Sequence, residues 1–315
     1  MKTKISDIHY CNVSKTRIGN ANPTLNKKNL KLLEYWIQER YKIHIKKDIQ
    51  KQTPPWTTDK ILQKYKFCNV KREHDKESKW LIKNISINNK INYEDKILNT
   101  ILFRLINKSQ TTQTFQPLNF KKINIEQIRK ELKQFKPNYI YFSNAFFMSG
   151  QKTAANKLSP TENNMIIKII KLIQYYQKQN IVNKIKQCES QNQVYLTLKQ
   201  QNGLGYFLSY QIFVDLTYIK EFPFSENEFV ISGPGCIKGL DLIFNNYNNL
   251  SYDEALFYLR DNQKRIFKLN NLFKELPKHD KLLNIMSLEN IMCEFSKYHR
   301  TENKLGRPKI LYRYQ

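Results

Sequence analysis

The chain has 315 residues, of which 40% are hydrophobic, so it can bury a core in one large or two small domains. Its 53 Lys and Arg against 27 Asp and Glu give a formal net charge of +26, which favours an anionic partner, nucleic acid above all. The 5 cysteines are scattered without a Cys-x-x-Cys pair, which argues against a disulfide framework or a zinc site, and no apolar run is long enough to span a membrane.

The same composition has a second explanation. Abundant Lys, Asn, Ile and Tyr with little Gly, Ala or Pro is typical of translation from an AT-rich genome, so the charge alone does not establish nucleic-acid binding. The histidines are scattered too, and we expect no metal and no cofactor. Because no apolar signal core begins the chain, we expect a soluble protein of the cytosol or nucleus with no membrane partner.

Helical periodicity dominates the chain. Residues 1–26 are polar and predict a flexible arm, and residues 108–122 predict a loop. The apolar stretch 139–148 fits a buried strand or, in so helical a chain, a buried helix flank. Thr58 or Asp59 is suited to cap a helix. Helices are expected at 30–45, 93–107, 125–135, 165–178, 181–198, from 206, from a capping box at 251–254, and at 287–298.

The glycines are concentrated, since five of the eight fall between Gly203 and Gly239. Gly203 and Gly205 separate a helix that ends at Leu198 from one that begins at Tyr206. Such a turn exposes N–H groups at the positive end of a helix dipole, where a phosphate can bind without a side chain. The alternative is an ordinary glycine-capped helical hairpin.

Two other stretches resemble nucleotide loops only superficially. The glycines at 233–239 are not followed by the Gly-Lys-Ser/Thr of a Walker A motif, and no strand pattern precedes them. The segment 149–153 lacks the glycine that should open such a loop. The sequence therefore excludes a self-contained P-loop kinase.

Charged side chains crowd beside aromatic ones near Trp56 and Trp80. Such crowding is more typical of an internal ion-pair network than of an active site. Arg72, Glu73 and Asp75 are the expected members of this network beside the aromatic residues.

Several motifs with uncommon residues occur in order along the chain. They are Pro-Pro-Trp-Thr at 54–57, Lys-Phe-Cys-Asn-Val-Lys-Arg-Glu at 66–73, Leu-Phe-Arg-Leu-Ile-Asn at 102–107, Gly-Leu-Gly-Tyr-Phe at 203–207, Gly-Pro-Gly at 233–235 and Leu-Glu-Asn-Ile-Met-Cys-Glu-Phe-Ser-Lys-Tyr at 288–298. Together they resemble the helical domain of the 5-hydroxymethyluracil DNA kinases and of the related alpha-glutamyl/putrescinyl thymine pyrophosphorylases. The resemblance extends over roughly residues 30–313. Two of the charged stretches recur together in that family, so the resemblance implies that the ion-pair network joins Arg72, Glu73 and Asp75 to Glu294 and Lys297 of the last helix.

That domain is similar to the helix-hairpin-helix DNA glycosylases, so the resemblance implies an all-α fold whose hairpin grips a DNA backbone. Glycosylase chemistry does not carry over, because Phe207 stands where bifunctional glycosylases have a lysine, and Glu226 is the nearest substitute for their aspartate. Asp215 and Glu226 are the remaining catalytic candidates. The DNA-binding candidates are Gly203, Gly205, Tyr206, Gln211, Lys238, Arg300, Arg307 and Lys309.

The lysine- and asparagine-rich composition also resembles that of ciliate proteins, and there a stand-alone domain of this kind is similar to the larger accessory subunit of the DNA N6-adenine methyltransferase complex. No methyltransferase Asp-Pro-Pro-Trp occurs, because Thr53 precedes Pro54-Pro55-Trp56. We therefore expect a non-catalytic nuclear subunit that binds duplex DNA beside methyltransferase subunits. An enzyme that transfers phosphoryl or pyrophosphoryl groups to 5-hydroxymethyluracil, and a scaffold without DNA contact, are the alternatives. The expected domain covers 27–300, between the arm 1–26 and a basic tail 301–315.

Overall fold

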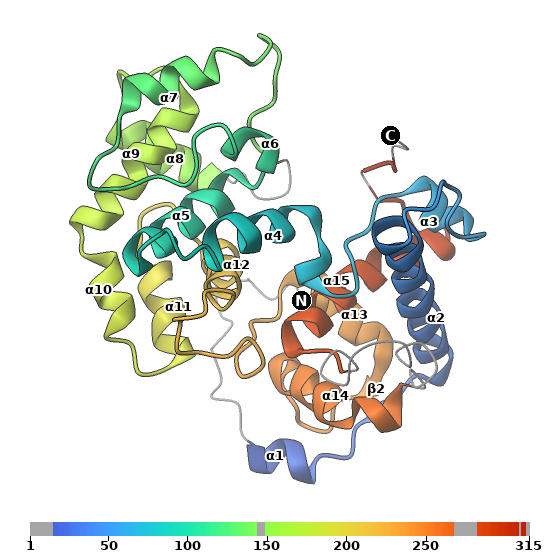
Figure 1. Ribbon diagram of the computed structural model, residues 1–315. Coiled ribbons are helices and arrows are strands. Elements are labelled where there is room, and N and C mark those ends of the chain that lie inside the picture. Colours follow the sequence, from blue (N-terminus) through green and yellow to red (C-terminus); the bar gives the residue numbers. More distant parts are fainter. Residues whose placement is uncertain (1–14, 144–148, 268–281, 309, 313–315) are drawn as a thin grey trace. The chain divides into compact units, whose positions relative to one another are not determined.

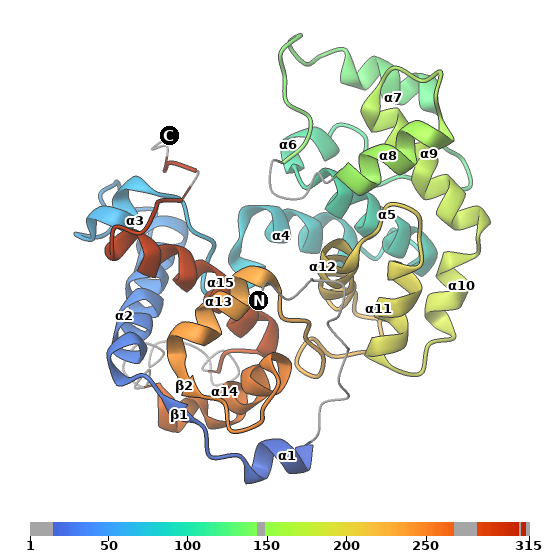
Figure 2. The ribbon, with the colours of Figure 1, turned by 180° about the vertical axis from the view of Figure 1, so that it is seen from behind.

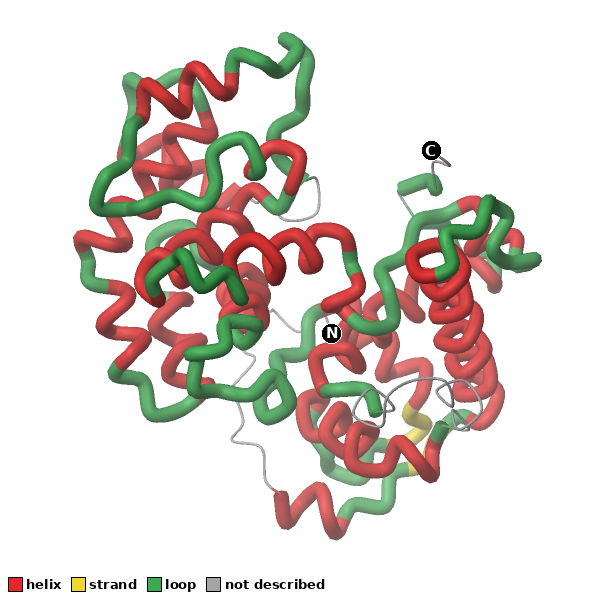
Figure 3. The backbone as a smooth tube through the Cα atoms, viewed as in Figure 1, coloured by secondary structure: helices red, strands yellow, loops and turns green. Residues whose placement is uncertain are grey.

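The computed structural model describes residues 15–143, 149–267, 282–308 and 310–312. Most of them fold as helices, joined by loops and one short pair of strands, which confirms the all-α prediction (Figure 1, Figure 3). The chain divides into two compact units. The first, called here the terminal unit, comprises the chain up to Arg72 together with the chain from Val230, and the second, the central unit, is Glu73–Phe229.

The terminal unit is built from both ends of the chain. The one sheet among its described residues is a short antiparallel pair in which Thr24 faces Asn246 and Leu25 faces Phe244 (Figure 2). Its elements are α1 (Lys15–Asn20), β1 (Thr24–Leu25), α2 (Lys27–His44), the π-helical turn η2 (Ile45–Ile49), α3 (Lys60–Lys64), α13 (Pro234–Ile243), β2 (Phe244–Asn246), α14 (Tyr252–Ile266) and α15 (Ile285–Glu302).

The central unit surrounds one buried helix. Every residue of α5 from Asp95 to Ile106 is buried, and α9 and α12 pack against it. The short 3-10 turn η3 (Arg72–His74) leads into this unit. Its elements are α4 (Lys76–Leu81), the π-helical turn η4 (Ile82–Ser86), α5 (Tyr93–Ile106), α6 (Ser109–Thr112), α7 (Ile125–Leu132), α8 (Ser149–Leu158), α9 (Met165–Lys178), α10 (Ile181–Lys186), α11 (Gln191–Lys199) and α12 (Tyr206–Leu216).

Small polar side chains determine where many helices begin. The predicted capping box at the start of α14 is confirmed, because Ser251 Oγ accepts from Glu254 N while the Glu254 carboxylate accepts from Ser251 N. Asp59, one of the two predicted caps, accepts from Ile61 N and Leu62 N at the start of α3. The abundant asparagine has the same role elsewhere, where it satisfies N–H groups that would otherwise lack partners. These caps are Asn26, Asn92, Asn124, Asn164 and Asn284.

The second glycine cluster serves close helix packing. A Cβ at Gly239 would lie 2.1 Å from the carbonyl oxygen of Met292, and one at Gly235 would lie 2.4 Å from Cys293 Sγ. Both distances are far shorter than van der Waals contact, so only glycine lets α13 approach α15 this closely. The packing of two helices therefore accounts for these glycines without a bound nucleotide.

The structure differs from the sequence expectations at several elements. The segment 181–198 forms two helices, because Ser190 caps a new one, and residues 149–153 begin α8. The expected loop at 108–122 contains α6, and the described part of the expected arm forms α1 and β1. Residues 139–143 are neither helix nor strand, while 144–148 lie outside the described residues. Among the described helices, none combines the length and apolar character needed to cross a membrane.

Candidate nucleic-acid interface

The Gly203–Gly205 turn lies between α11 and α12 of the central unit. Gly203 has φ +86°, a left-handed conformation that favours glycine. A Cβ there would also lie 2.9 Å from both the Cα of Gln151 and the Cβ of Ala154. Gly203 is therefore required by its own backbone and by the proximity of α8.

Gly205 is different, because no contact with the described part of the chain requires a glycine there. It is the N-cap of α12 with φ −81° and ψ 175°, a conformation open to any residue, and a Cβ there would meet no atom within 4 Å. A glycine cap supplies no side-chain acceptor for the first-turn N–H groups of the helix. The N-terminus of α12 therefore combines donors, the positive end of a helix dipole and open space, which suits an external anion.

Hydrogen bonds from two buried side chains anchor the turn and the neighbouring helix α8. The buried Gln151 donates from Nε2 to the carbonyl of Leu105 in α5 at 2.9 Å, which fixes α8 under the turn. The buried Tyr176 of α9 donates its hydroxyl to the carbonyl of Asn202. A backbone anchored in this way is preorganised for binding, so little conformational entropy is lost when a ligand docks.

Asp215 lies further along α12 and is committed to an ion pair. Arg104 of α5 donates to both carboxylate oxygens, from Nε at 2.5 Å and from Nη2 at 2.6 Å. Both side chains are buried, and Arg104 also donates to Asn107 Oδ1 at 2.9 Å. A carboxylate held by such a bidentate pair joins α5 to α12, and this geometry favours a structural role over proton transfer.

The terminal unit holds a buried polar cluster at the start of α13, defined by Ser232, Gly233, Asp253, Glu289 and Arg72. Asp253 Oδ1 accepts from Ser232 N at 2.8 Å and from Ser232 Oγ at 2.6 Å. Glu289 accepts from the N–H of Gly233. Burial raises the pKa of Glu289 to about 7, although the charge of Arg72 opposes this rise, and burial raises the pKa of Asp253 as well.

A family model of the 5-hmdU DNA kinase helical domain matches residues 27–306. This chain belongs to that family. A curated relative, the 5-hmdU DNA kinase of Bacillus phage SP10, is 27% identical over 279 residues. The match covers 83% of this chain and 43% of that kinase, so the chain spans less than half the length of its relative. No solved structure matches the chain significantly.

Membership in the 5-hmdU DNA kinase helical-domain family confirms that part of the resemblance inferred from the ordered motifs. Two of these motifs coincide with the features described above. Gly-Leu-Gly-Tyr-Phe at 203–207 forms the turn and the start of α12, and Gly-Pro-Gly at 233–235 forms the start of α13. Neither the family description nor the kinase relative names a methyltransferase.

The predicted DNA-binding residues fall in both units. Gly203, Gly205 and the half-buried Tyr206 are neighbours at the turn, whereas Gln211 is only 4% exposed on α12. The remaining candidates belong to the terminal unit. Lys238 is exposed on α13, Arg300 packs its side chain against Gly306, Arg307 is exposed, and Lys309 lies outside the described residues. Of the described candidates, only the turn residues are therefore close neighbours in the chain.

Two residues of the expected ion-pair network, Glu294 and Lys297, lie together on α15 of the terminal unit. Glu294 accepts from Cys68 N at 3.2 Å and pairs with Lys297 Nζ at 2.5 Å, which links α15 to the stretch after Phe67. Arg72 acts electrostatically on Glu289, a residue that the expected network did not include. Glu73 and Asp75 belong to the central unit, where Asp75 precedes α4.

Sequence reasoning missed Ser232, Asp253 and Glu289. A local signal existed for two of them, since Asp253 lies inside the recognised capping box and Glu289 inside the last family motif. The catalytic candidate Glu226 is partly exposed in the loop between α12 and α13. The thiols beside the cluster are not activated, because burial raises the pKa of Cys293 to about 12 and that of Cys236 well above its ordinary value. No group of metal-ligating side chains occurs in the described ranges.

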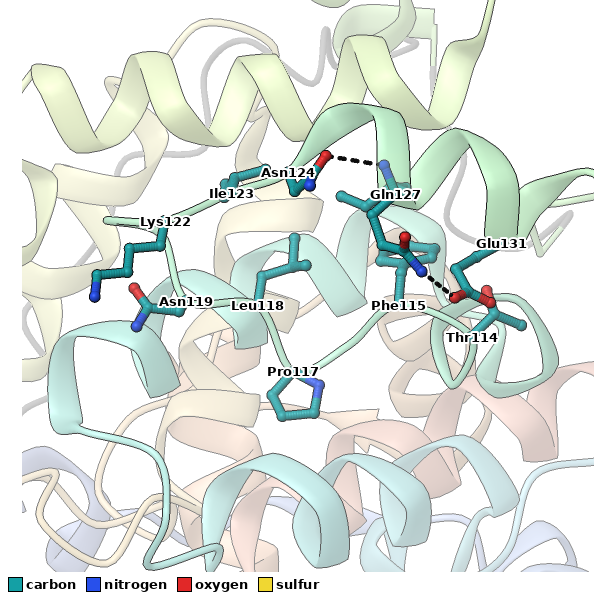
Figure 4. Close-up of a pocket in the computed structure, with 11 residues that line it drawn as sticks. Thr114, Phe115, Pro117, Leu118, Asn119, Lys122, Ile123, Asn124, Gln127 and Glu131 are labelled. Carbon is teal, nitrogen blue, oxygen red and sulfur yellow. Dashed lines mark hydrogen bonds between the residues drawn. The ribbon is translucent and has the colours of Figure 1, made fainter.

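The central unit also has a shallow pocket of about 250 Å³ between the loop after Thr114 and α7 (Figure 4). Gln127 donates to Glu131 at 2.7 Å along its wall, and Asn124 caps α7 beside it. Lys122 is the one basic residue of the lining. None of the predicted site residues lines this pocket, and its side chains do not form a catalytic constellation.

Proposed function

We propose that this chain is a DNA-binding helical module that acts in the modification of a thymine-derived base, 5-hydroxymethyluracil, in DNA. The observation that carries the proposal is the family match over residues 27–306, which includes both the hairpin and the α13 cluster. The open N-terminus of α12 supports it, because a turn of this kind can hold a backbone phosphate through N–H groups.

The module's contribution is to bind and position the DNA. A phosphoryl donor needs a cradle for its phosphates, and this sequence has no Walker A loop. In this proposal a separate nucleotide-binding unit supplies the donor, and the helical module presents the base to it. Phosphoryl transfer depends mainly on positioning and charge stabilisation, so a module that only holds DNA still contributes to the rate.

The earlier expectation of a subunit in a DNA N6-adenine methyltransferase complex stays a prediction, as does a nuclear location. No feature of the described site favours methyl transfer over the modification of a pyrimidine. Mass spectrometry of chains that co-purify with the native protein separates these roles. A nucleotide-dependent kinase among them supports the proposal, whereas methyltransferase subunits alone would replace it with the earlier expectation.

Binding to defined duplexes tests the proposal directly. Affinity is measured by fluorescence anisotropy for duplexes that differ only in one 5-hydroxymethyluracil in place of thymine, from low to moderate salt. We expect binding to both duplexes with a steep salt dependence, because each neutralised phosphate releases condensed counterion. Tighter binding of the modified duplex would show recognition of the base itself. Absence of binding at low salt would reject the proposal.

A further inference from the structure

A second basic surface lies in the terminal unit, where the C-terminal tail docks on the end of α3. Lys66 N donates to the carbonyl of Ile310 at 3.0 Å, and Tyr312 N donates to the carbonyl of Lys64 at 2.9 Å. These bonds form an antiparallel bridge between Tyr65 and Leu311. We call the resulting patch the tail surface, and its members are Lys46, Lys47, Trp56, Lys64, Lys66 and Tyr312.

Lys47 is held in place by aromatic rings. Its ammonium lies 5.3 Å from the centroid of the Trp56 ring and 5.0 Å from that of Tyr312, and it also donates to the Tyr312 hydroxyl. The two rings meet edge to face at 5.8 Å. Cation–π contacts of this kind fix the position of an ammonium without neutralising its charge.

Lys46 is fixed by a neutral group as well, since its Nζ donates to the carbonyl of Trp56 at 3.2 Å. Both lysines lie in the π-helical turn η2, a departure from α-helical geometry that is frequent at functional sites. Asp48 is the one acid of that turn. Its Oδ2 lies 2.7 Å from Nδ1 of the buried His44, so it pairs with the histidine and with neither lysine. Two oriented positive charges therefore remain uncompensated.

Lys64 and Lys66 extend the same patch. Both are exposed on either side of the buried Tyr65. Within the described residues, none of the four lysines of the tail surface pairs with an acid. Such a concentration of oriented charge is costly in self-repulsion, and a partner with regularly spaced anions relieves it. Because the rings of Trp56 and Tyr312 engage each other and Lys47, they do not form an open platform on which unpaired bases could stack.

We propose that the tail surface is a second DNA-binding surface, which contacts the phosphate backbone of duplex DNA through Lys46, Lys47, Lys64 and Lys66. The inference rests on the proposed function, since it concerns the same ligand. It adds a contact area that is separate from the α12 turn. The half-exposed Ile310 and Leu311 would also suit a protein partner, and that reading is an outcome of the test below.

The test is the salt dependence of duplex binding by the triple variant Lys47→Gln, Lys64→Gln, Lys66→Gln. Each phosphate contact contributes about 0.9 to the slope of log affinity against log salt, so losing three contacts lowers the slope by about 2 to 3. A matched control neutralises three exposed lysines of the central unit, Lys90, Lys121 and Lys133, and removes the same total charge. We expect the control to keep a slope close to that of the parent protein.

The outcomes separate this inference from the proposed function. If the parent protein binds duplex and the triple variant shows the parent slope, the tail surface is not a DNA contact, although the proposed function stands. The half-exposed Ile310 and Leu311 would then assign this surface to a protein partner. Equal reductions of the salt slope in the triple variant and in the control would also overturn the inference, because the total charge of the protein would then be responsible for the slope. If the parent protein does not bind at all, both fail. Circular dichroism confirms that each variant is folded. The double variant Lys64→Gln, Lys66→Gln leaves the contacts of Lys47 with Trp56 and Tyr312 intact and should show an intermediate slope.

Discussion

Gly205 in the first glycine cluster differs from Gly235 and Gly239 in the second, because contacts within the protein account only for the latter two. Gly235 and Gly239 are accounted for inside the protein, because α15 occupies the space that their side chains would need. Gly205 has open space where a Cβ would stand and an ordinary backbone conformation. A glycine that neither packing nor backbone geometry requires is the better indicator of an external ligand.

The buried carboxylates of the two units differ in how fully their charges are paired. Asp215 in the central unit has both oxygens bound by Arg104. Glu289 in the terminal unit is also buried. The charge of Arg72 and the N–H of Gly233 offset only part of the effect of burial, so the pKa of Glu289 rises to about 7. The first carboxylate is part of a structural pair, whereas the second keeps a proton equilibrium close to neutral pH.

The largest effect is expected at the buried pair. Asp215→Ala leaves the guanidinium of Arg104 buried without its partner, which costs about 3 to 5 kcal/mol of unfolding free energy. Urea denaturation measures it, with Glu189→Ala, which removes an exposed carboxylate of the same unit, as the control. Unchanged stability together with lost function would instead return Asp215 to the catalytic candidates.

A pH-dependent effect is expected at Glu289. Its pKa is raised in the folded state from an ordinary 4.5 to about 7, so its contribution to stability is fully present below about pH 4.5 and is lost as the pH rises through about 7. Glu289→Gln mimics the protonated form and removes that loss. Relative to the parent protein, the variant should therefore gain up to about 3 kcal/mol between pH 5 and pH 8.

Urea midpoints at the two pH values measure this gain. Arg72, Asp253, Lys297 and the thiols of Cys236 and Cys293 all act on Glu289 or are acted on by it, so each must be intact in both proteins. If the difference in urea midpoint between the variant and the parent protein does not change with pH, Glu289 keeps an ordinary pKa in the folded protein.

A smaller loss is expected at the packed glycine. Gly239→Ala places a methyl group 2.1 Å from a backbone oxygen of α15, so the helices must separate at a cost of about 1 to 3 kcal/mol or more. Gly19→Ala in α1 is the control, because a Cβ there meets no atom within 4 Å. Thermal unfolding should show a lower midpoint for the first variant alone. Equal midpoints would mean that α13 and α15 do not pack this closely.

Local patterns predicted local structure well. The helix expected at 93–107 is found as Tyr93–Ile106, since its apolar periodicity and its Asn92 cap are both encoded in neighbouring residues. The α13 cluster was not foreseen, because Asp253 and Glu289 approach Gly233 only through the packing of α14 and α15 with α13. The Arg104–Asp215 pair was missed for the same reason, as its members are 111 residues apart in the chain.

The docked tail shows another limit on predicting structure from a single sequence. A basic C-terminal segment predicts charge but not position, and the hydrogen bonds that join residues 310–312 to residues 64–66 use backbone groups that any sequence possesses. The aromatic residues Trp56 and Tyr312 carried a signal only in combination, once the fold had brought them to 5.8 Å from each other. Long-range placement of this kind has no periodicity that a single sequence can reveal.

The most direct test of the central claim is the duplex affinity of Gly205→Asp. Aspartate is a good N-cap, so the variant should keep or raise the melting temperature, while its carboxylate occupies the first-turn N–H groups and repels phosphate. Because a hydrogen bond to a charged group contributes about 1.5 to 3 kcal/mol, affinity for duplex DNA should fall at least about tenfold. Asn124→Asp, which adds the same charge at the N-cap of α7, should bind as the parent protein does. Unchanged affinity in a folded Gly205→Asp variant would contradict the assignment of the α12 turn as the phosphate site.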